Sequence, residues 1–235
     1  MYLKKFSQAC ENNKQPIAVC LEAYLRPLVQ QGPLAEQDFS MLDSSQINKC
    51  LSPSVLEIGS GTGQHGCYFC KKFPEISWQP TDIAENLPGI EAWVKEAELE
   101  NLKDPIRFDV DHPKGDEFYD KFIMRALSLY SHIYTANTLH IMSWESVMNF
   151  FQWIPKLLQT QGLLFIYGPF KFKGSFTTAS NERFDGFLKQ KAPHQGIRDF
   201  EAIEILAAKI GLVLHAKHDL PANNHLLVWM KQQAA

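Results

Sequence analysis

This 235-residue sequence has neither a strong excess of one charge sign nor a long apolar run. Its 23 basic residues are balanced by 26 acidic residues, which gives a formal net charge of −3. A dedicated nucleic-acid-binding protein normally carries a basic stripe, so we predict no nucleic-acid partner. No window approaches the roughly 18 consecutive apolar residues of a membrane-spanning helix, so we predict no membrane association.

Cysteine is also scarce, and the five residues form an odd set. An odd number argues against a complete disulfide framework, and residues 1–16 lack the long apolar core of a signal peptide. We therefore expect a reducing, cytoplasmic location. Cys67 and Cys70 are either a redox or metal pair or two small apolar residues on one helix face. The absence of a second cysteine pair favours packing, and we predict no metal site.

Apolar residues make up 45% of the chain and alternate between strand-like and helix-like patterns. The predicted strands are residues 54–60, 76–82, 105–111, 129–137, 162–169, 212–218 and 225–231. The predicted helices are residues 16–30, 64–73, 88–102, 143–159 and 199–211. This alternation indicates a mostly parallel sheet covered on both faces. The last two strands have no helix between them, so we expect an antiparallel hairpin at one end of the sheet. We expect a single domain over residues 1–235.

Two prolines suggest helix boundaries. Pro16 suits the first turn of the helix at 16–30, and polar residues 31–53 are expected to form a connector. Together these segments give an N-terminal helical extension over residues 1–50. Pro155 is expected to kink the helix at 143–159 or to begin a new turn. Five side chains of that helix are predicted to share one face: Trp144, Val147, Met148, Phe151 and Ile154.

The stretch VLEIGSGTGQHG at residues 55–66 places glycines directly after a buried strand. Glycine lets a backbone approach a ligand closely, and ligands of doubly wound sheets bind at the carboxyl ends of the strands. GTGQHG at 61–66 matches the dinucleotide fingerprint, which on its own is a weak signal for a nicotinamide oxidoreductase. Glu57 at the strand end favours a cationic ligand instead. Asp82, at the end of the second strand, suits a ribose diol in either case.

Two sets of motifs carry a family resemblance. LEIGSGTGQH, with TD at the second strand end, resembles the first two motifs of class I S-adenosylmethionine-dependent methyltransferases. ACENNKQPI, NTLHI, YGPF, SNERFD, GIRDFEAI and PANN resemble the methyltransferase-like 26 family, over about residues 8–230. The resemblance implies a Rossmann-like, doubly wound, mostly parallel seven-stranded sheet ending in the hairpin. It also implies S-adenosylmethionine as cofactor and S-adenosylhomocysteine as product.

The resemblance further implies roles for eight residues. Gly59, Gly61 and Gly63 would pack against the methionyl part of the cofactor, with Glu57 near its ammonium group or organising the loop. The remaining four are Asp82 at the ribose hydroxyls, Ile83 on the adenine, Asp109 at the adenine amine and Asn137 at the methionyl end. The alternative for both aspartates is a helix cap, since acids are common at strand-to-helix turns.

The substrate side is expected to include His140, as either a general base or a histidine that hydrogen-bonds loop backbone. We expect the pocket to include Tyr134, Trp144, Tyr167, Phe170, Asn181, Asn223 and Asn224. The alternative is that the aromatic residues belong to the core and that the asparagine pair only shapes the hairpin turn. The long polar segment at 169–198 is predicted to be a loop or lid over the substrate.

These patterns predict a methyltransferase with an unidentified acceptor. No DPPY-like or NPPY-like run follows the fourth strand, which argues against methylation of amino groups in DNA or of glutamine. A small molecule is the first expectation and a protein side chain the second. A non-catalytic cofactor-binding sensor or partner subunit is the alternative, and a nicotinamide oxidoreductase is a further one. The sequence makes no prediction of the oligomeric state.

Overall fold

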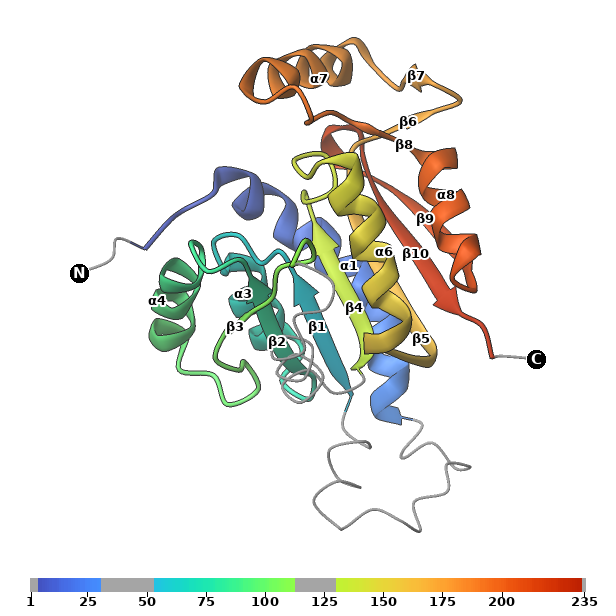
Figure 1. Ribbon diagram of the computed structural model, residues 1–235. Coiled ribbons are helices and arrows are strands. Elements are labelled where there is room, and N and C mark those ends of the chain that lie inside the picture. Colours follow the sequence, from blue (N-terminus) through green and yellow to red (C-terminus); the bar gives the residue numbers. More distant parts are fainter. Residues whose placement is uncertain (1–3, 31–52, 113–129, 234–235) are drawn as a thin grey trace.

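A seven-stranded sheet forms the centre of the protein, whose computed structural model describes residues 4–30, 53–112 and 130–233 (Figure 1). The strand order is β3-β2-β1-β4-β5-β10-β9. Neighbours from β3 to β5 pair in parallel, whereas β10 is antiparallel to both β5 and β9. The strands are β1 (Ser54–Ile58), β2 (Ser77–Asp82), β3 (Ile106–Arg107), β4 (Tyr130–Ala136), β5 (Leu158–Gly168), β9 (Leu212–Leu220) and β10 (Asn224–Lys231). The predicted fold class and the predicted C-terminal hairpin are both confirmed.

Helices cover both faces of this sheet, which gives three layers. On one face, α1 (Gln8–Gln30), α3 (Gln64–Lys72) and α4 (Leu87–Ala97) contribute to one apolar cluster. On the other face, α6 (Trp144–Leu157) and α8 (Phe200–Lys209) contribute to a second cluster. The central strands β1 and β4 are therefore covered on both sides, and nearly all of their residues are buried.

Helix α1 begins at Gln8, eight residues before the predicted start at Pro16. Proline inside a helix removes one backbone hydrogen bond, which made it a reasonable boundary in the sequence. The helix continues through it because Ile17, Leu21 and Leu25 are almost fully buried in the cluster that α1 shares with α3. Residues 31–52, which include most of the predicted connector, lie outside the described residues.

Helix α6 runs through Pro155 to Leu157 without the predicted restart. Lys231 Nζ donates to the carbonyl oxygens of Pro155 and Leu158 at 2.8 and 2.6 Å, so the end of the helix has a cationic partner. The predicted apolar face of α6 is partly wrong. Trp144 and Met148 are 37% and 36% exposed, because the buried face is displaced toward residues such as Phe150 and Trp153.

Residues 169–198, predicted to be a loop or lid over the substrate, form regular secondary structure rather than an irregular loop. This unit contains β6 (Phe170–Phe172), β7 (Ser175–Phe176), α7 (Ala179–Lys191) and β8 (Arg198–Asp199), with strand order β7-β6-β8. Thr178 caps α7 by accepting from the backbone of Asn181. The unit lies beyond the carboxyl ends of the parallel strands (Figure 1). The guanidinium of Arg198 joins it to the segment after β4 by donating to the carbonyls of Leu139 and Met142.

Cys67 and Cys70 are both buried on α3, and burial raises the pKa of the Cys67 thiol to about 11. Both side chains belong to the apolar cluster that α1, α3 and α4 share, which supports the interpretation that they pack in the core. Within residues 4–30, 53–112 and 130–233, no cluster of three His, Cys, Asp or Glu side chains is arranged to hold a metal ion. In the same ranges no helix has the length and apolarity to span a bilayer.

Candidate functional site

A cavity of about 730 Å³ lies at the carboxyl ends of β1, β2 and β4 and is called cavity 1 here. Several predicted residues line it: Gly59, Gly61, Asp82, Ile83, Asp109, Asn137 and His140. The position follows from the parallel topology, because the turns after neighbouring strands meet at the same edge of the sheet.

The glycines of the loop after β1 serve different purposes. All three have positive φ, at 74° for Gly59, 61° for Gly61 and 86° for Gly63. A Cβ atom at Gly59 would lie 2.8 Å from Thr138 Cγ2, and one at Gly63 would lie 3.2 Å from Ile90 Cγ2. A Cβ atom at Gly61 would meet nothing within 4 Å. Gly59 and Gly63 therefore permit close packing, whereas Gly61 leaves open space for a ligand.

Asp82 is held firmly at the edge of cavity 1. Its Oδ2 accepts from the backbone N–H of Gly61 at 2.7 Å, and its Oδ1 accepts from Ile83 N and Asn86 Nδ2 at 2.8 and 2.9 Å. Burial raises the pKa of Asp82, and these donors oppose that shift. Helix α4 begins only after Asn86, so Asp82 is not its N-cap. Each carboxylate oxygen has more than one acceptor site, which leaves capacity for a ligand.

Glu57 does not line cavity 1, contrary to the expectation that its carboxylate faces a ligand. It is 2% exposed, and its Oε2 accepts from Trp78 Nε1 at 3.0 Å. Burial raises the pKa of Glu57 to about 7, against the opposing hydrogen bonds from Trp78 and Ser60. The alternation of side chains along β1 directs Glu57 behind the glycine loop, where it contacts the loop through Ser60. Of the two roles that the family resemblance implied, this position fits organisation of the loop.

The raised pKa of Glu57 predicts a pH-dependent stability. The folded protein retains the proton up to about pH 7, whereas the unfolded chain releases it near pH 4.5. The stabilisation is thus complete below pH 4.5 and is lost as the pH rises to about 7. The loss is on the order of 3 kcal/mol. Buried His65, His132 and His140, whose pKa values are lowered to about 4, contribute the opposite pH dependence. The expected result is therefore a difference between wild type and Glu57→Gln that changes by this amount in urea unfolding between pH 5 and pH 8. An equal pH slope in wild type, Glu57→Gln and the exposed control Glu85→Gln would contradict the assignment.

Asp109, Asn137 and Ile83 reach cavity 1 from three different strand ends. Asp109 Oδ1 accepts from the backbone of Asp111 at 3.0 Å. Asn137 adopts a positive φ of 57°, which asparagine tolerates better than most residues, and its N–H donates to Tyr167 O at 2.8 Å. Ile83 is 41% exposed, so it presents an apolar side chain to the cavity.

His140 is 7% exposed and lies edge-on to the Phe184 ring, at a centroid distance of 5.4 Å. Burial, together with the positive charge of Arg198, lowers the pKa of His140 to about 4. The imidazole is therefore neutral at pH 7 and can accept a proton or a hydrogen bond. Its backbone carbonyl accepts from Gly196 N at 2.9 Å, which ties this turn to the unit that contains α7.

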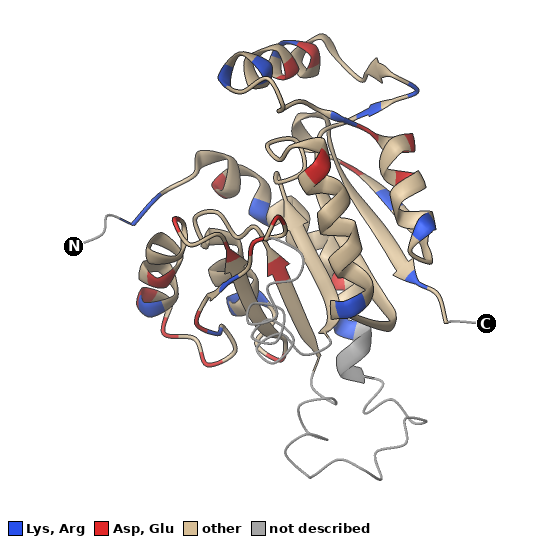
Figure 2. Ribbon diagram, viewed as in Figure 1, with Lys and Arg blue, Asp and Glu red and all other residues tan. Residues whose placement is uncertain are grey.

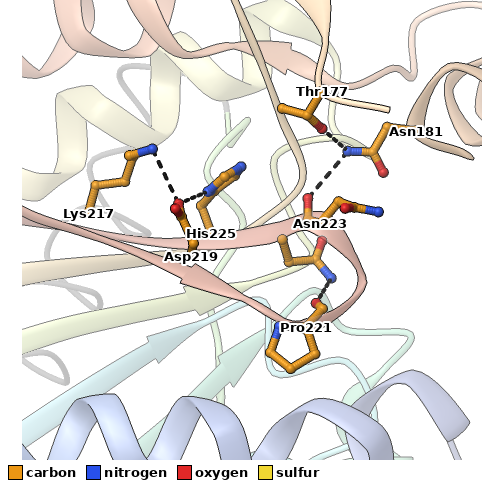
Figure 3. A network of polar contacts seen from close by, with 8 residues as sticks. Thr177, Asn181, Lys217, Asp219, Pro221, Asn223 and His225 are labelled. Atoms are coloured by element: carbon orange, nitrogen blue, oxygen red, sulfur yellow. Dashed lines mark hydrogen bonds and ion pairs between the residues drawn. The ribbon is translucent and has the colours of Figure 1, made fainter. Parts of the chain in front are cut away.

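A second cavity of about 430 Å³, called cavity 2, adjoins cavity 1 and shares Ala9, Asn137 and Phe184 with it. Four residues predicted for the substrate pocket line cavity 2: Tyr167, Asn181, Asn223 and Asn224. In Figure 3, Asn181 Nδ2 donates to Thr177 Oγ1 at 2.9 Å and to the Asn223 carbonyl at 3.3 Å. These bonds join α7 to the turn between β9 and β10.

Three residues predicted for the substrate pocket line neither cavity. Tyr134 is fully buried, with its ring against Phe69 and Trp78, and therefore belongs to the core. Phe170 is 2% exposed in the opposite apolar cluster. Trp144 lies in the first turn of α6 with a partly exposed side chain.

The start of α1 lines both cavities, which the sequence interpretation missed. Ser7 and Cys10 contact cavity 1, while Asn12 and Asn13 contact cavity 2. The backbone N–H of Ser7 donates to Gln64 Oε1 at 2.6 Å, which fixes this segment against the glycine loop. The stretch ACENNKQPI at 9–17 was noted only for its family resemblance. The run of polar residues directly before the predicted helix was the feature of the sequence that could have indicated a cavity-lining segment.

A sequence profile described as "Protein of unknown function (DUF938)" matches residues 4–231, nearly the whole chain. The chain belongs to the DUF938 family. This match includes every residue named above for the two cavities of the DUF938 chain. The comparisons do not confirm the resemblance to the methyltransferase-like 26 family.

Solved structures with the same fold as the DUF938 chain include three O-methyltransferases. An O-methyltransferase family protein from Burkholderia thailandensis has a TM-score of 0.64 and 12% identity, covering 94% of this chain and 60% of that one. The mitomycin 7-O-methyltransferase MmcR gives 0.63 and 13%, with 90% and 54% covered. An O-methyltransferase family 2 protein from Planctomyces limnophilus DSM 3776, in complex with apigenin, gives 0.64 and 14%, with 93% and 61% covered. At these identities the likeness shows the fold, and this chain spans between 54% and 61% of their lengths.

Proposed function

We propose that this DUF938 chain is an S-adenosylmethionine-dependent methyltransferase that acts on a small-molecule acceptor. The observation that carries the proposal is the pair of adjoining cavities at the carboxyl ends of the strands. Cavity 1 has the glycine loop and Asp82, and cavity 2 meets it at Asn137 and Phe184. Two further structures of the same fold, CalO1 and PigF, are described as containing S-adenosylhomocysteine, which supports this cofactor class.

The residues of cavity 1 fit S-adenosylmethionine chemically. Asp82 offers carboxylate oxygens to a ribose diol, and Ile83 offers an exposed apolar side chain to an adenine ring. Asp109 offers an acceptor to the adenine amine. The open space at Gly61 admits a ligand close to the backbone, and Asn137 lies where the two cavities meet. When bound, the cofactor supplies an electrophilic methyl group on a sulfonium centre.

The protein contributes binding and alignment to this reaction. Cavity 2 would hold the acceptor atom in line with the methyl group, since alignment provides much of the rate in a displacement of this kind. Phe184, shared by both cavities, would present an aromatic ring near a cationic centre. Neutral His140 would accept the proton of a hydroxyl acceptor. A His140→Ala variant with the turnover of wild type would contradict this role.

Three alternatives are weighed against this proposal. A nicotinamide oxidoreductase is less well supported, because the antiparallel β10 is inserted between β5 and β9. A non-catalytic cofactor-binding protein would use cavity 1 alone, whereas this chain has the second cavity. A protein acceptor is the second choice after a small molecule. Helices α7 and α8 each have an acid in the first turn and lysine in the last turn, so neither helix carries charge of one sign only (Figure 2).

The experiment is isothermal calorimetry of the purified chain with S-adenosylmethionine, S-adenosylhomocysteine and NAD. We expect one site for each of the first two ligands and no heat for NAD. Binding of NAD alone would overturn the proposal in favour of the oxidoreductase. If both sulfur ligands bind, transfer of a labelled methyl group to a compound that binds cavity 2 supports an enzyme. Its absence for every such compound supports the non-catalytic alternative.

A further inference from the structure

The polar side chains that line cavity 2 are mainly amides. Six asparagines contribute to it: Asn12, Asn13, Asn137, Asn181, Asn223 and Asn224. Among the described residues that line it, none has a charged side chain, and the remaining lining is made of proline, alanine, serine, tyrosine and phenylalanine. The asparagines come from α1, the end of β4, α7 and the turn before β10, so the chemistry is assembled from four separate segments.

Hydrogen bonds between buried side chains determine which atoms in one wall of cavity 2 are donors and which are acceptors. His65 is neutral at pH 7, because burial lowers its pKa to about 4. Its Nδ1 lies 3.3 Å from the Tyr134 hydroxyl, and its Nε2 lies 2.7 Å from Asn13 Oδ1. Both contacts are satisfied when Tyr134 donates to Nδ1 and Nε2–H donates to Asn13. This assignment leaves the Asn13 side-chain N–H groups as donors.

Tyr167, which is 3% exposed, also lines this wall of the cavity. Burial raises the pKa of its hydroxyl, and the side chains of Asn224 and Asn13 oppose that shift. A phenolic hydroxyl can donate or accept a hydrogen bond. The wall therefore offers one hydroxyl, and the asparagine amides around it offer both donors and acceptors.

The nearest charges of the hairpin are already engaged with one another. Asp219 Oδ1 accepts from His225 Nδ1 at 2.9 Å and from Lys217 Nζ at 3.2 Å, away from the Asn181–Asn223 contact (Figure 3). None of these three residues lines cavity 2. An ionised group placed among the asparagines would lose part of its hydration without gaining a counter-ion from the lining, and that exchange is unfavourable.

We propose that cavity 2 selects an uncharged, hydrogen-bonding acceptor molecule, such as a neutral phenol, alcohol or amide. It would bind through the asparagines and the Tyr167 hydroxyl. This inference rests on the proposed function, because it names the substrate class of the same site. The cavity volume of about 430 Å³ lies at the lower end of ligand pockets, so the occupant is a small molecule rather than a polymer segment.

The test compares molecules that match in shape and differ in charge. Benzamide, benzoate and benzylamine, each with and without a para-hydroxyl group, would be examined by saturation-transfer NMR at pH 7. The spectra would be recorded with and without S-adenosylhomocysteine. We expect the neutral amides to bind and the anions and cations to bind at least tenfold more weakly. Binding of a charged member as tight as that of its amide would overturn the inference, as would the failure of every amide to bind.

Four variants, one of them a control, test whether binding takes place in cavity 2. Ser180→Trp, at the exposed rim of cavity 2, should abolish amide binding, whereas Gln190→Trp on the same helix, lining neither cavity, should leave it unchanged. Asn223→Asp keeps a residue type that tolerates its φ of 56° and adds a negative charge, so preference should move toward benzylamine. Tyr167→Phe should weaken amide binding about three- to tenfold. An unchanged preference in Asn223→Asp would count against the assignment even if Ser180→Trp is unstable.

The two proposals fail in different ways. If S-adenosylhomocysteine does not bind but the amides still bind in a Ser180-dependent manner, the cofactor assignment fails and the neutral pocket stands. If S-adenosylhomocysteine binds and charged molecules displace the amides, the methyltransferase assignment stands and the neutral-acceptor inference fails.

Discussion

Replacing Asp82 with alanine is expected to lower the affinity for S-adenosylmethionine and S-adenosylhomocysteine by at least about a hundredfold. The three donors already on Asp82 leave one acceptor position for a ribose hydroxyl, and a hydrogen bond to a charged group contributes about 1.5–3 kcal/mol, whose upper part accounts for this factor. The variant also leaves Gly61 N without the acceptor that holds the loop in position. Calorimetric titration of both ligands measures the loss directly.

The matched control is Glu85→Ala, which removes an exposed acid three residues along the chain that lines neither cavity. Its affinity should stay within about twofold of wild type, since distant exposed charges are screened. Asp82→Asn keeps the shape and one acceptor oxygen, so its loss should be intermediate. Wild-type affinity in Asp82→Ala would refute the ribose role and would require another cofactor geometry in cavity 1.

Replacing Gly59 with alanine is expected to destabilise the fold by about 2–5 kcal/mol. Its φ of 74° lies in the left-handed region, where a residue with a Cβ is strained by roughly 1–2 kcal/mol. The added methyl would also lie 2.8 Å from Thr138 Cγ2 and 3.0 Å from Thr138 Oγ1. Overpacking of this kind costs about 1–3 kcal/mol more. Urea unfolding at fixed pH measures the change in the free energy of unfolding.

Two further variants separate strain from overlap. Gly61→Ala has a similar φ of 61° but open space around the new methyl, so only about 1–2 kcal/mol should be lost. Because that methyl enters cavity 1, cofactor affinity should fall even though the loss of stability is smaller than in Gly59→Ala. In a Thr138→Ala background, Gly59→Ala should recover the overlap part of its cost in a double-mutant cycle. Equal destabilisation by both glycine replacements would show that Thr138 is not the cause.

Local patterns in the sequence were enough to predict the sheet and several residues of cavity 1. The alternation of strands and helices indicated a parallel sheet, and two final strands without a helix between them indicated the hairpin. Gly61 and Asp82 were named because ligands of doubly wound sheets bind at the carboxyl ends of the strands, whereas Asn137 was named from the family resemblance. These inferences depend on the short-range order of apolar residues, glycines and acids along the chain, which the fold preserves.

Other features depended on contacts between distant segments. Glu57 was expected to face a ligand, but the buried indole of Trp78, 21 residues away, gives it a partner behind the loop. The buried face of α6 was displaced toward Phe150 because the packing against α8 and the sheet, rather than apolar spacing alone, decides which side is covered.

The sequence by itself determined the fold class, the glycine loop and the acids at the strand ends, since each follows from residues close together in the chain. Only the tertiary structure decided that the start of α1 lines both cavities and that residues 169–198 are a folded unit. It alone brought asparagines from four segments around cavity 2. The physical reason is that charge and hydrogen-bond complementarity in a cavity depend on which distant side chains pack together. No local pattern encodes that arrangement.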